Sequence, residues 1–268
     1  MAQLHDHLSA LFSSTMTSFT QSWGFVVVRT AYADDEATDA AQWFTALARI
    51  QEYALPSGNN ARMRPDSFAL PVVADPTLKG ASYDAVRTAF NAWIKQYQEE
   101  YKLYLGVRQD CCLVVDGPAL ASLLQAPDRE KRPKQPALEP WVVAVDAKDP
   151  ATIPYDGGGP YLGWTRVCVL SLEDLFGDIE ARSLVQISPI RLYDGQLPLY
   201  NGIPGGGTLI DPEGGVEGRY KFPQGTPRGI VRANAMLADI EQALGRQAVK
   251  LTSGTGERYY GLYQSLTY

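Results

Sequence analysis

Histidine is almost missing from this 268-residue chain, which holds 2, His5 and His7, both close to the N-terminus. Hydrolases with a Ser-His-Asp or Cys-His arrangement need a histidine beside the nucleophile. Common zinc sites take histidine and cysteine ligands. The long histidine-free part of the chain therefore argues against both kinds of site, and we expect no metal.

Cysteine is also scarce, and the 3 cysteines are Cys111, Cys112 and Cys168. An odd number with two direct neighbours is typical of reduced thiols rather than of a disulfide framework. The first 23 residues lack the basic start and apolar core of a secretory signal, and no apolar run approaches membrane-spanning length. We therefore expect a cytoplasmic protein without a membrane partner.

The glycine-rich motifs that bind nucleotides, the Walker A sequence and the dinucleotide motif, are absent as well. The redox or metal motif CxxC is also absent. We expect no cofactor. The net charge of −6 and the pI near 5.0 argue against a surface for nucleic acid. A basic run leaves such a contact open, although its prolines favour a solvated linker. The run consists of Arg129, Lys131, Arg132 and Lys134.

Buried strands and amphipathic helices alternate along the chain. Strands are predicted over residues 23–32, 110–116, 141–146 and 163–170. Helices are predicted after the first two strands, because apolar residues recur there about every 3.6 residues. Connections that contain a helix favour parallel neighbours, whereas the third and fourth strands could be antiparallel. The sequence predicts one α/β domain over residues 1–268, with a mixed, mainly parallel, Rossmann-like sheet flanked by helices.

Residues 188–229 hold ten glycines and six prolines. So many turn-forming residues predict an irregular insertion or a lid. The stretch "GIPGGGT" contains Gly205 and Gly206, whose backbone amides could approach an anion, although plain flexibility is the favoured explanation of the glycines. A last helix is predicted over residues 228–244.

Aspartates follow the first three predicted strands: Asp34 with Asp35, then Asp116, then Asp146. Parallel strands end at one edge of a sheet, where open α/β folds bind ligands. The carboxylates of Asp34, Asp116 and Asp146 could then meet as catalytic acids and bases. Helix capping and turn geometry explain each aspartate without a function.

Two arginines lie inside predicted strands, Arg29 and Arg166. A buried guanidinium must be paired, either with a carboxylate of the crevice or with an anionic substrate group. Tyr32, near the same edge, could donate a hydrogen bond to a ligand or simply pack its ring. Trp164 could stack on a ligand or be buried.

The stretches "WGFVVVRTAYADD", "GWTRVCVLSLEDLF" and "RLYDGQLPLYNG" resemble a set of cytosolic proteins from filamentous fungi. That set opens with a Trp-Gly-aromatic strand followed by Arg-Thr-x-Tyr, and it has no assigned activity. The resemblance covers residues 20–200 discontinuously and implies a shared fold and a fungal origin, not a reaction. The matching positions are Trp23, Gly24, Arg29, Thr30, Tyr32, Gly163 and Trp164.

These features favour an enzyme for a small anionic or carbonyl-bearing substrate, built on Asp, Arg and Tyr. It would be a cyclase, lyase, isomerase or transferase of the type found in fungal specialised metabolism. A non-catalytic binding or regulatory protein with the same residues in an ion-pair network is the alternative. A tRNA-dependent aminoacyl transferase of the cyclodipeptide synthase type is a third, less favoured one.

Overall fold

The computed structural model describes residues 23–55, 65–101, 106–153, 159–212, 214, 217–222, 238 and 242. The chain divides into two compact units. The first comprises residues 1–154 and 159–221, and the second comprises residues 155–158 and 222–268. The helix expected over 228–244 lies almost wholly outside the described residues, and the single domain stays a prediction.

Within the described residues the main sheet has seven strands. Three neighbouring pairs are parallel (β4–β2, β2–β5 and β7–β8) and three are antiparallel (β5–β6, β6–β7 and β8–β9). The mixed α/β class is therefore confirmed, whereas a mainly parallel, Rossmann-like sheet is not. The strands, in spatial order, are β4 (Val72–Val73), β2 (Val27–Arg29), β5 (Cys111–Val115), β6 (Trp141–Asp146), β7 (Trp164–Cys168), β8 (Leu197–Tyr200) and β9 (Thr208–Ile210).

The pairing of β5 with β6 differs most from the prediction. A helix, α4 (Gly117–Gln125), follows β5, yet β6 runs antiparallel to β5 with Cys111 opposite Asp146. The chain starts and ends this connection at the same edge of the sheet, because residues 126–140 return it after the short helix. A helix in a connection therefore favours a parallel neighbour only when the rest of the linker does not run back along the helix to the edge where the first strand ended.

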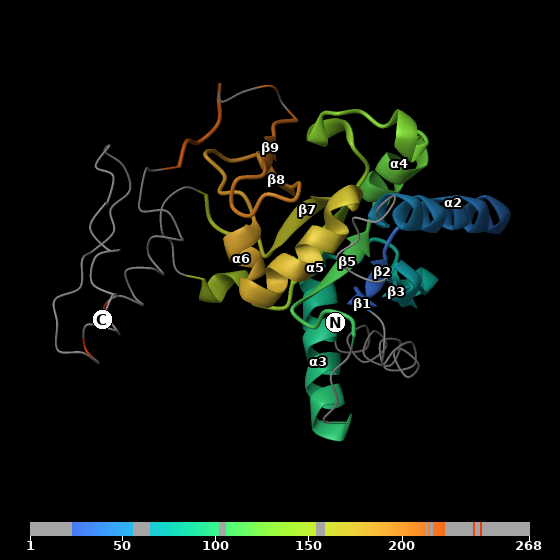
Figure 1. Ribbon diagram of the computed structural model, residues 1–268, viewed down its shortest axis with the longest axis horizontal. Coiled ribbons are helices and arrows are strands. Elements are labelled where there is room, and N and C mark those ends of the chain that lie inside the picture. Colours follow the sequence, from blue (N-terminus) through green and yellow to red (C-terminus); the bar gives the residue numbers. More distant parts are fainter. Residues whose placement is uncertain are drawn as a thin grey trace, which may run out of the picture. The chain divides into compact units, whose positions relative to one another are not determined.

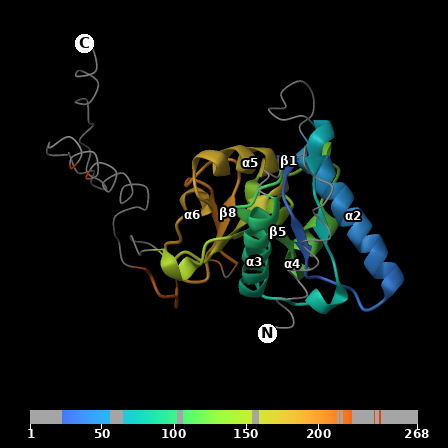
Figure 2. The same cartoon turned by 90° about the horizontal axis from the view of Figure 1, so that it is seen from below.

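The two faces of the sheet carry different helices (Figures 1 and 2). Helices α2 (Glu36–Ala54) and α5 (Leu172–Ala181) pack on the face of Phe25 and Arg29: Arg29 pairs with Asp39 of α2, and Phe25 contacts Phe176 of α5. Helix α4 packs beside α2. Helix α3 (Tyr83–Tyr101) packs on the other face, where the Tyr83 and Trp164 rings meet. Helix α6 (Leu184–Ile187) follows α5.

Helix starts agree with the local sequence signals. The Asp35 side chain accepts a hydrogen bond from the Thr38 amide at 2.8 Å and so caps α2. The Ser82 hydroxyl accepts from the Ala85 amide at 3.2 Å at the start of α3. Each bond satisfies one of the amides that a first helical turn leaves without a backbone partner.

The expected strand over residues 23–32 is divided in two. Trp23–Gly24 forms β1, which pairs with β3 (Phe68–Ala69) in a separate two-stranded sheet. Gly24 has φ +140°, and a Cβ at this position would lie 2.1 Å from the Ala69 carbonyl oxygen. Only glycine fits this close approach of two backbones. The Trp-Gly pair of the sequence therefore serves strand packing.

The segment from residue 188, predicted to be irregular, contains two short strands in its described part, β8 and β9, which extend the sheet. Gly205 and Gly206 lie in the turn between these two strands and are exposed. The Gly205 amide donates to the Ile187 carbonyl at 2.8 Å. It is therefore not available for an anion, and its φ of +67° explains the glycine.

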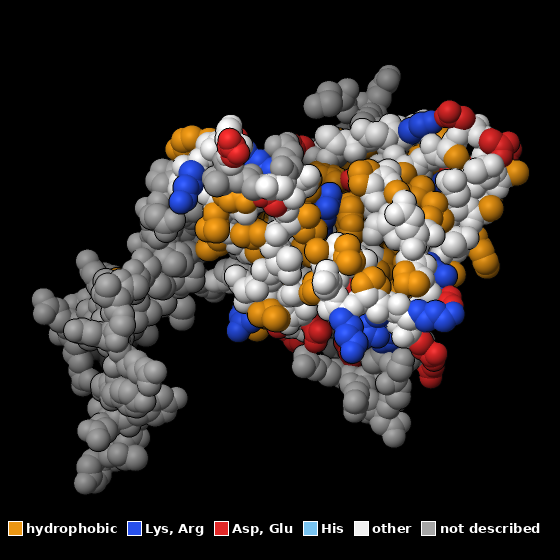
Figure 3. Space-filling model, turned by 90° about the horizontal axis from the view of Figure 1, so that it is seen from above, with side chains coloured by type: hydrophobic (Ala, Val, Ile, Leu, Met, Phe, Trp, Pro, Cys, Tyr) orange, Lys and Arg blue, Asp and Glu red, His pale blue; other side chains and the backbone are white. Residues whose placement is uncertain are grey.

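The core lies between the sheet and its helices, with every residue of β5 and β6 buried. Figure 3 shows hydrophobic side chains across the middle of the face that it draws, with charged side chains mostly toward its edges. None of the helices in the described segments combines the length and the hydropathy that a membrane crossing requires.

Candidate functional site

Strands β2, β5 and β7 end at the same edge of the sheet. Strands β2 and β5 are parallel, and β7 has the same direction as β5 because both are antiparallel to β6. Beside the ends of β2 and β5 lies an open cavity of about 400 Å³, lined by Thr30, residues 80–83 and residues 116–117. Pockets at the carboxyl ends of strands are the usual ligand sites of α/β folds.

A hydrogen-bonded pair, Tyr83 and Asp116, lies in the wall of this cavity. The Tyr83 hydroxyl donates to Asp116 Oδ2 at 2.5 Å, and Asp116 Oδ1 accepts from the Ala119 amide at 2.9 Å, which caps α4. Burial, and then the bond to the carboxylate, raises the pKa of Tyr83 well above its usual value. The phenol therefore stays neutral and oriented by Asp116.

Arg166 of β7 lies within electrostatic reach of Tyr83 and Asp116. Its guanidinium carbon lies 3.8 Å from the centroid of the Trp141 ring. The side chain is half-buried, and no residue in the described part of the chain forms a hydrogen bond or an ion pair with it. Burial lowers the pKa of Arg166, whereas the nearby Asp116 raises it. Among the described residues, this cation thus has no bound counter-charge.

Trp164 stands two residues before Arg166 on β7, so both side chains project from the same face. Its ring meets the Tyr83 ring edge-on, with centroids 5.2 Å apart. Trp164 is half-buried and therefore helps to hold Tyr83 in place.

Arg29 has a structural partner, and it is not an aspartate of the crevice. Its guanidinium binds Asp39 Oδ1 at 2.5 Å and donates through Nε to the Ala31 carbonyl at 2.8 Å. The rings of Tyr32 and Trp43 lie 4.3 and 4.7 Å from the guanidinium carbon. Arg29 is 5% exposed, so the expectation that it binds substrate is not supported by its position.

Tyr32 is engaged with the backbone on both sides. Its hydroxyl donates to the Arg29 carbonyl at 3.2 Å and accepts from the Asp75 amide at 2.6 Å. Burial raises the pKa of Tyr32 to about 12. The hydroxyl thus fixes the loop at Asp75, in contrast to the expected role as a donor to a ligand.

Asp34 does not point into the crevice. Its fully exposed carboxylate pairs with Lys79 Nζ at 2.5 Å, and this hydrogen bond lowers the pKa of Asp34. Lys79 precedes Gly80, whose amide donates to the Thr30 carbonyl at 2.9 Å. The ion pair therefore lies near the rim of the cavity and contributes little to stability.

Asp146 lies at the opposite edge of the sheet, because β6 runs antiparallel to β5. It is 3% exposed, accepts from the Tyr161 hydroxyl at 2.8 Å and from the Lys148 amide at 2.8 Å, and has a pKa raised by burial. The expectation that Asp34, Asp116 and Asp146 meet in one crevice is therefore wrong. Only Asp116 of the three faces the cavity.

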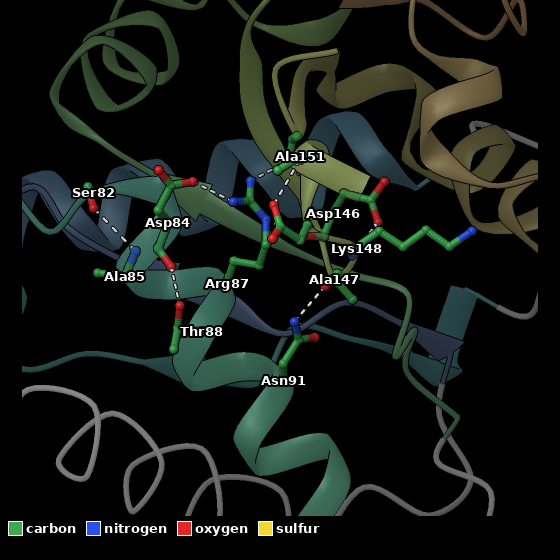
Figure 4. Close-up of polar contacts among 12 residues, drawn as sticks. Ser82, Asp84, Ala85, Arg87, Thr88, Asn91, Asp146, Ala147, Lys148 and Ala151 are labelled. Carbon is green, nitrogen blue, oxygen red and sulfur yellow. Dashed lines mark hydrogen bonds and ion pairs between the residues drawn. The ribbon is translucent and has the colours of Figure 1, made fainter. Parts of the chain in front are cut away.

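Arg87 anchors α3 to this opposite edge (Figure 4). Its Nε donates to the Asp146 carbonyl at 2.9 Å, its NH2 donates to the Gly163 carbonyl at 2.9 Å, and Asp84 accepts from its NH1. Asn91 adds a bond to the Ala147 carbonyl at 2.5 Å. Because Tyr83 opens the same helix, this anchor fixes where Tyr83 meets Asp116.

The basic run begins with a short 3-10 turn, η3 (Arg129–Lys131), and acidic groups lie close to part of it. The Arg129 amide donates to Glu52 at 2.9 Å, Lys131 pairs with Asp128 at 3.3 Å, and Arg132 lies 3.9 Å from Glu139. This interleaving gives no support to a nucleic-acid contact. In the described part of the chain, no three or more His, Cys, Asp or Glu side chains gather as a metal site would require.

No family model matches this chain, and neither the curated proteins nor the solved structures provide a match. The resemblance to fungal proteins therefore stays a prediction. The site rests on its own geometry.

Two residues of this geometry were missed by sequence reasoning. Tyr83 stands directly after Ser82, whose hydroxyl caps α3, and the first turn of this helix places Tyr83 at the sheet edge. Asp39 lies one turn into α2, ten residues after Arg29, and helical spacing from the strand end could have indicated it.

Proposed function

We propose that this chain binds and converts a small molecule with an anionic group, in the cavity beside Tyr83 and Asp116, with Arg166 as the group that binds the anion. The supporting observation is the half-buried guanidinium of Arg166, which has no ion-pair partner in the described residues. Withdrawing a charge from water is costly unless a counter-charge compensates. A carboxylate or phosphate would supply it in the bidentate geometry that arginine favours.

The Tyr83–Asp116 pair gives the site a route for a proton. Asp116 can take the proton of Tyr83 while the Tyr83 oxygen takes one from a substrate atom beside the bound anion. The atoms balance as a net transfer from the substrate to the carboxylate. Proton abstraction of this kind suits an isomerase or a lyase, two of the classes that the sequence favours.

A non-catalytic binding protein is the second candidate. Both oxygens of Asp116 already accept hydrogen bonds, from Tyr83 and from the Ala119 amide. Each oxygen therefore has less lone-pair capacity open to a substrate proton. The same anion would then bind without reaction.

Calorimetric titration with small carboxylates and inorganic phosphate tests the proposal. The Arg166→Gln variant should lose at least about tenfold in affinity. The control is Arg182→Gln, which removes the same charge from an exposed position directly after α5 and should bind as the native chain does. Equal affinities in Arg166→Gln and the native chain would refute the site. Product formation from a bound ligand, followed by NMR, separates the enzyme from the binding protein.

A further inference from the structure

Two kinds of polar group lie at this site: Tyr83 and Asp116 in the wall of the cavity, and Arg166, which does not line the cavity but lies within electrostatic reach of both. The Tyr83 hydroxyl donates its one hydrogen bond to Asp116, so its oxygen can only accept a further hydrogen bond. An ionised carboxylate such as Asp116 also only accepts. Arg166 is the opposite, because a guanidinium has donors and no acceptor. The Tyr83–Asp116 side of the site accepts hydrogen bonds, and the Arg166 side donates them.

These two sides do not neutralise each other. Arg166 and Asp116 affect each other electrostatically, yet they form no ion pair in the described structure. The Arg166 guanidinium stacks on Trp141 instead, which leaves its edge free for a planar anion. Opposite charges at a partly buried site that are kept out of contact leave room for a group that binds both.

We propose that the ligand carries, beside its anionic group, a hydrogen-bond donor such as a hydroxyl or an amino group, as in small hydroxy acids and amino acids. The anion binds Arg166, and the donor binds the Tyr83 oxygen and Asp116. This inference rests on the proposed function, since it names the ligand class of the same site. The cavity of about 400 Å³ is suited to a molecule of this size.

Three probes with the same two carboxylates provide the test: succinate, which lacks a further donor, malate, which adds a hydroxyl, and aspartate, which adds an ammonium. Titration calorimetry at pH 7 should show malate or aspartate binding about tenfold tighter than succinate, which is the effect of one hydrogen bond to a charged group. The Asp116→Asn variant keeps a good helix cap, because asparagine caps as well as aspartate does.

In Asp116→Asn the amide can donate, so the preference for a donor-bearing ligand should fall to about twofold or less while succinate binds no more weakly than before. Tyr83→Phe provides a second variant, in which the preference should also weaken. Binding of all three probes with equal affinity, together with loss in Arg166→Gln, would overturn the ligand class and leave the proposed function standing. Binding of none, or binding that ignores Arg166→Gln, would overturn both.

Discussion

Arg29 at the end of β2 and Asp39 in the first turn of α2 form a 2.5 Å ion pair that joins the strand to the helix. The same Asp39 oxygen accepts from the Ala33 amide at 2.6 Å, which fixes the loop between the two elements. The cation in the buried strand is thus explained by structure. Arg166, the other strand arginine, has no such partner among the described residues.

The two arginines should therefore differ in their effect on stability. Arg29→Gln leaves the Asp39 carboxylate without its partner and should lower the free energy of unfolding by about 3 kcal/mol. Arg166→Gln breaks no ion pair and should change it by less than about 1 kcal/mol, which is the scale of a cation–π contact. Urea denaturation of both variants measures the difference. A larger loss in Arg166→Gln than in Arg29→Gln would show that Arg166 is the structural cation.

Asp116 should stabilise the fold mainly as the cap of α4. Asp116→Ala removes the acceptor for the Ala119 amide and should cost about 1 kcal/mol, whereas Asp116→Asn keeps it and should cost about 0.5 kcal/mol or less. Chemical denaturation at pH 7 compares the two. If both variants lose the same stability, the carboxylate charge, rather than the cap, holds α4.

The buried carboxyl of Asp146 should make the free energy of unfolding depend on pH, with a sign that follows from its pKa. Because burial raises its folded-state pKa above the ordinary value of 3.8, the folded state holds this proton more tightly than the unfolded state does. The associated stabilisation is complete below the ordinary pKa and is lost as the pH rises through the raised one. The native chain should therefore gain stability relative to Asp146→Asn between pH 7 and pH 4.5.

Urea denaturation of the native chain and of Asp146→Asn at these two pH values gives the comparison, and the difference between the proteins removes the effect of all other groups. A relative loss of native stability on acidification would mean that Asp146 is held as a stabilised carboxylate.

Gly163→Ala should weaken the anchor between α3 and the sheet. Gly163 has φ +75°, and a Cβ there would lie 2.3 Å from Arg87 NH2. We expect a loss of about 2 kcal/mol in unfolding free energy from backbone strain and the displaced guanidinium. Gly177→Ala is the control, since Gly177 lies inside α5 with open space around it and should gain about 0.5 kcal/mol. An unchanged unfolding temperature in Gly163→Ala would contradict this prediction, because it would show that the Arg87 side chain can move aside without a loss of stability.

Local signals predicted the elements well because they depend on local chemistry. The caps at Asp35, Ser82 and Asp116 and the apolar runs of β5 and β6 lie where the sequence indicates. Strand direction depends on the whole linker, and residues 126–140 return the chain to the edge it left. The glycines near residue 205 are typical of loops, yet they form a tight turn between two strands.

The candidate site was predicted in part for the same reason. Asp116 and Arg166 lie within electrostatic reach of each other because β5 and β7 have the same direction, whereas Asp146 lies at the other edge because β6 is reversed. The Tyr83–Asp116 bond joins residues 33 positions apart, and no local pattern encodes such a contact. Sequence reasoning found the charges and missed their pairing.

The most direct measurement is NMR of the arginine Nε–H groups during a titration with malate, with the Arg166 signal assigned by its loss in Arg166→Gln. The account predicts that this signal shifts in a saturable way while that of Arg29, held by Asp39, stays in place. A still Arg166 signal, with shifts at other arginines only, would contradict the claim that this guanidinium binds the anion.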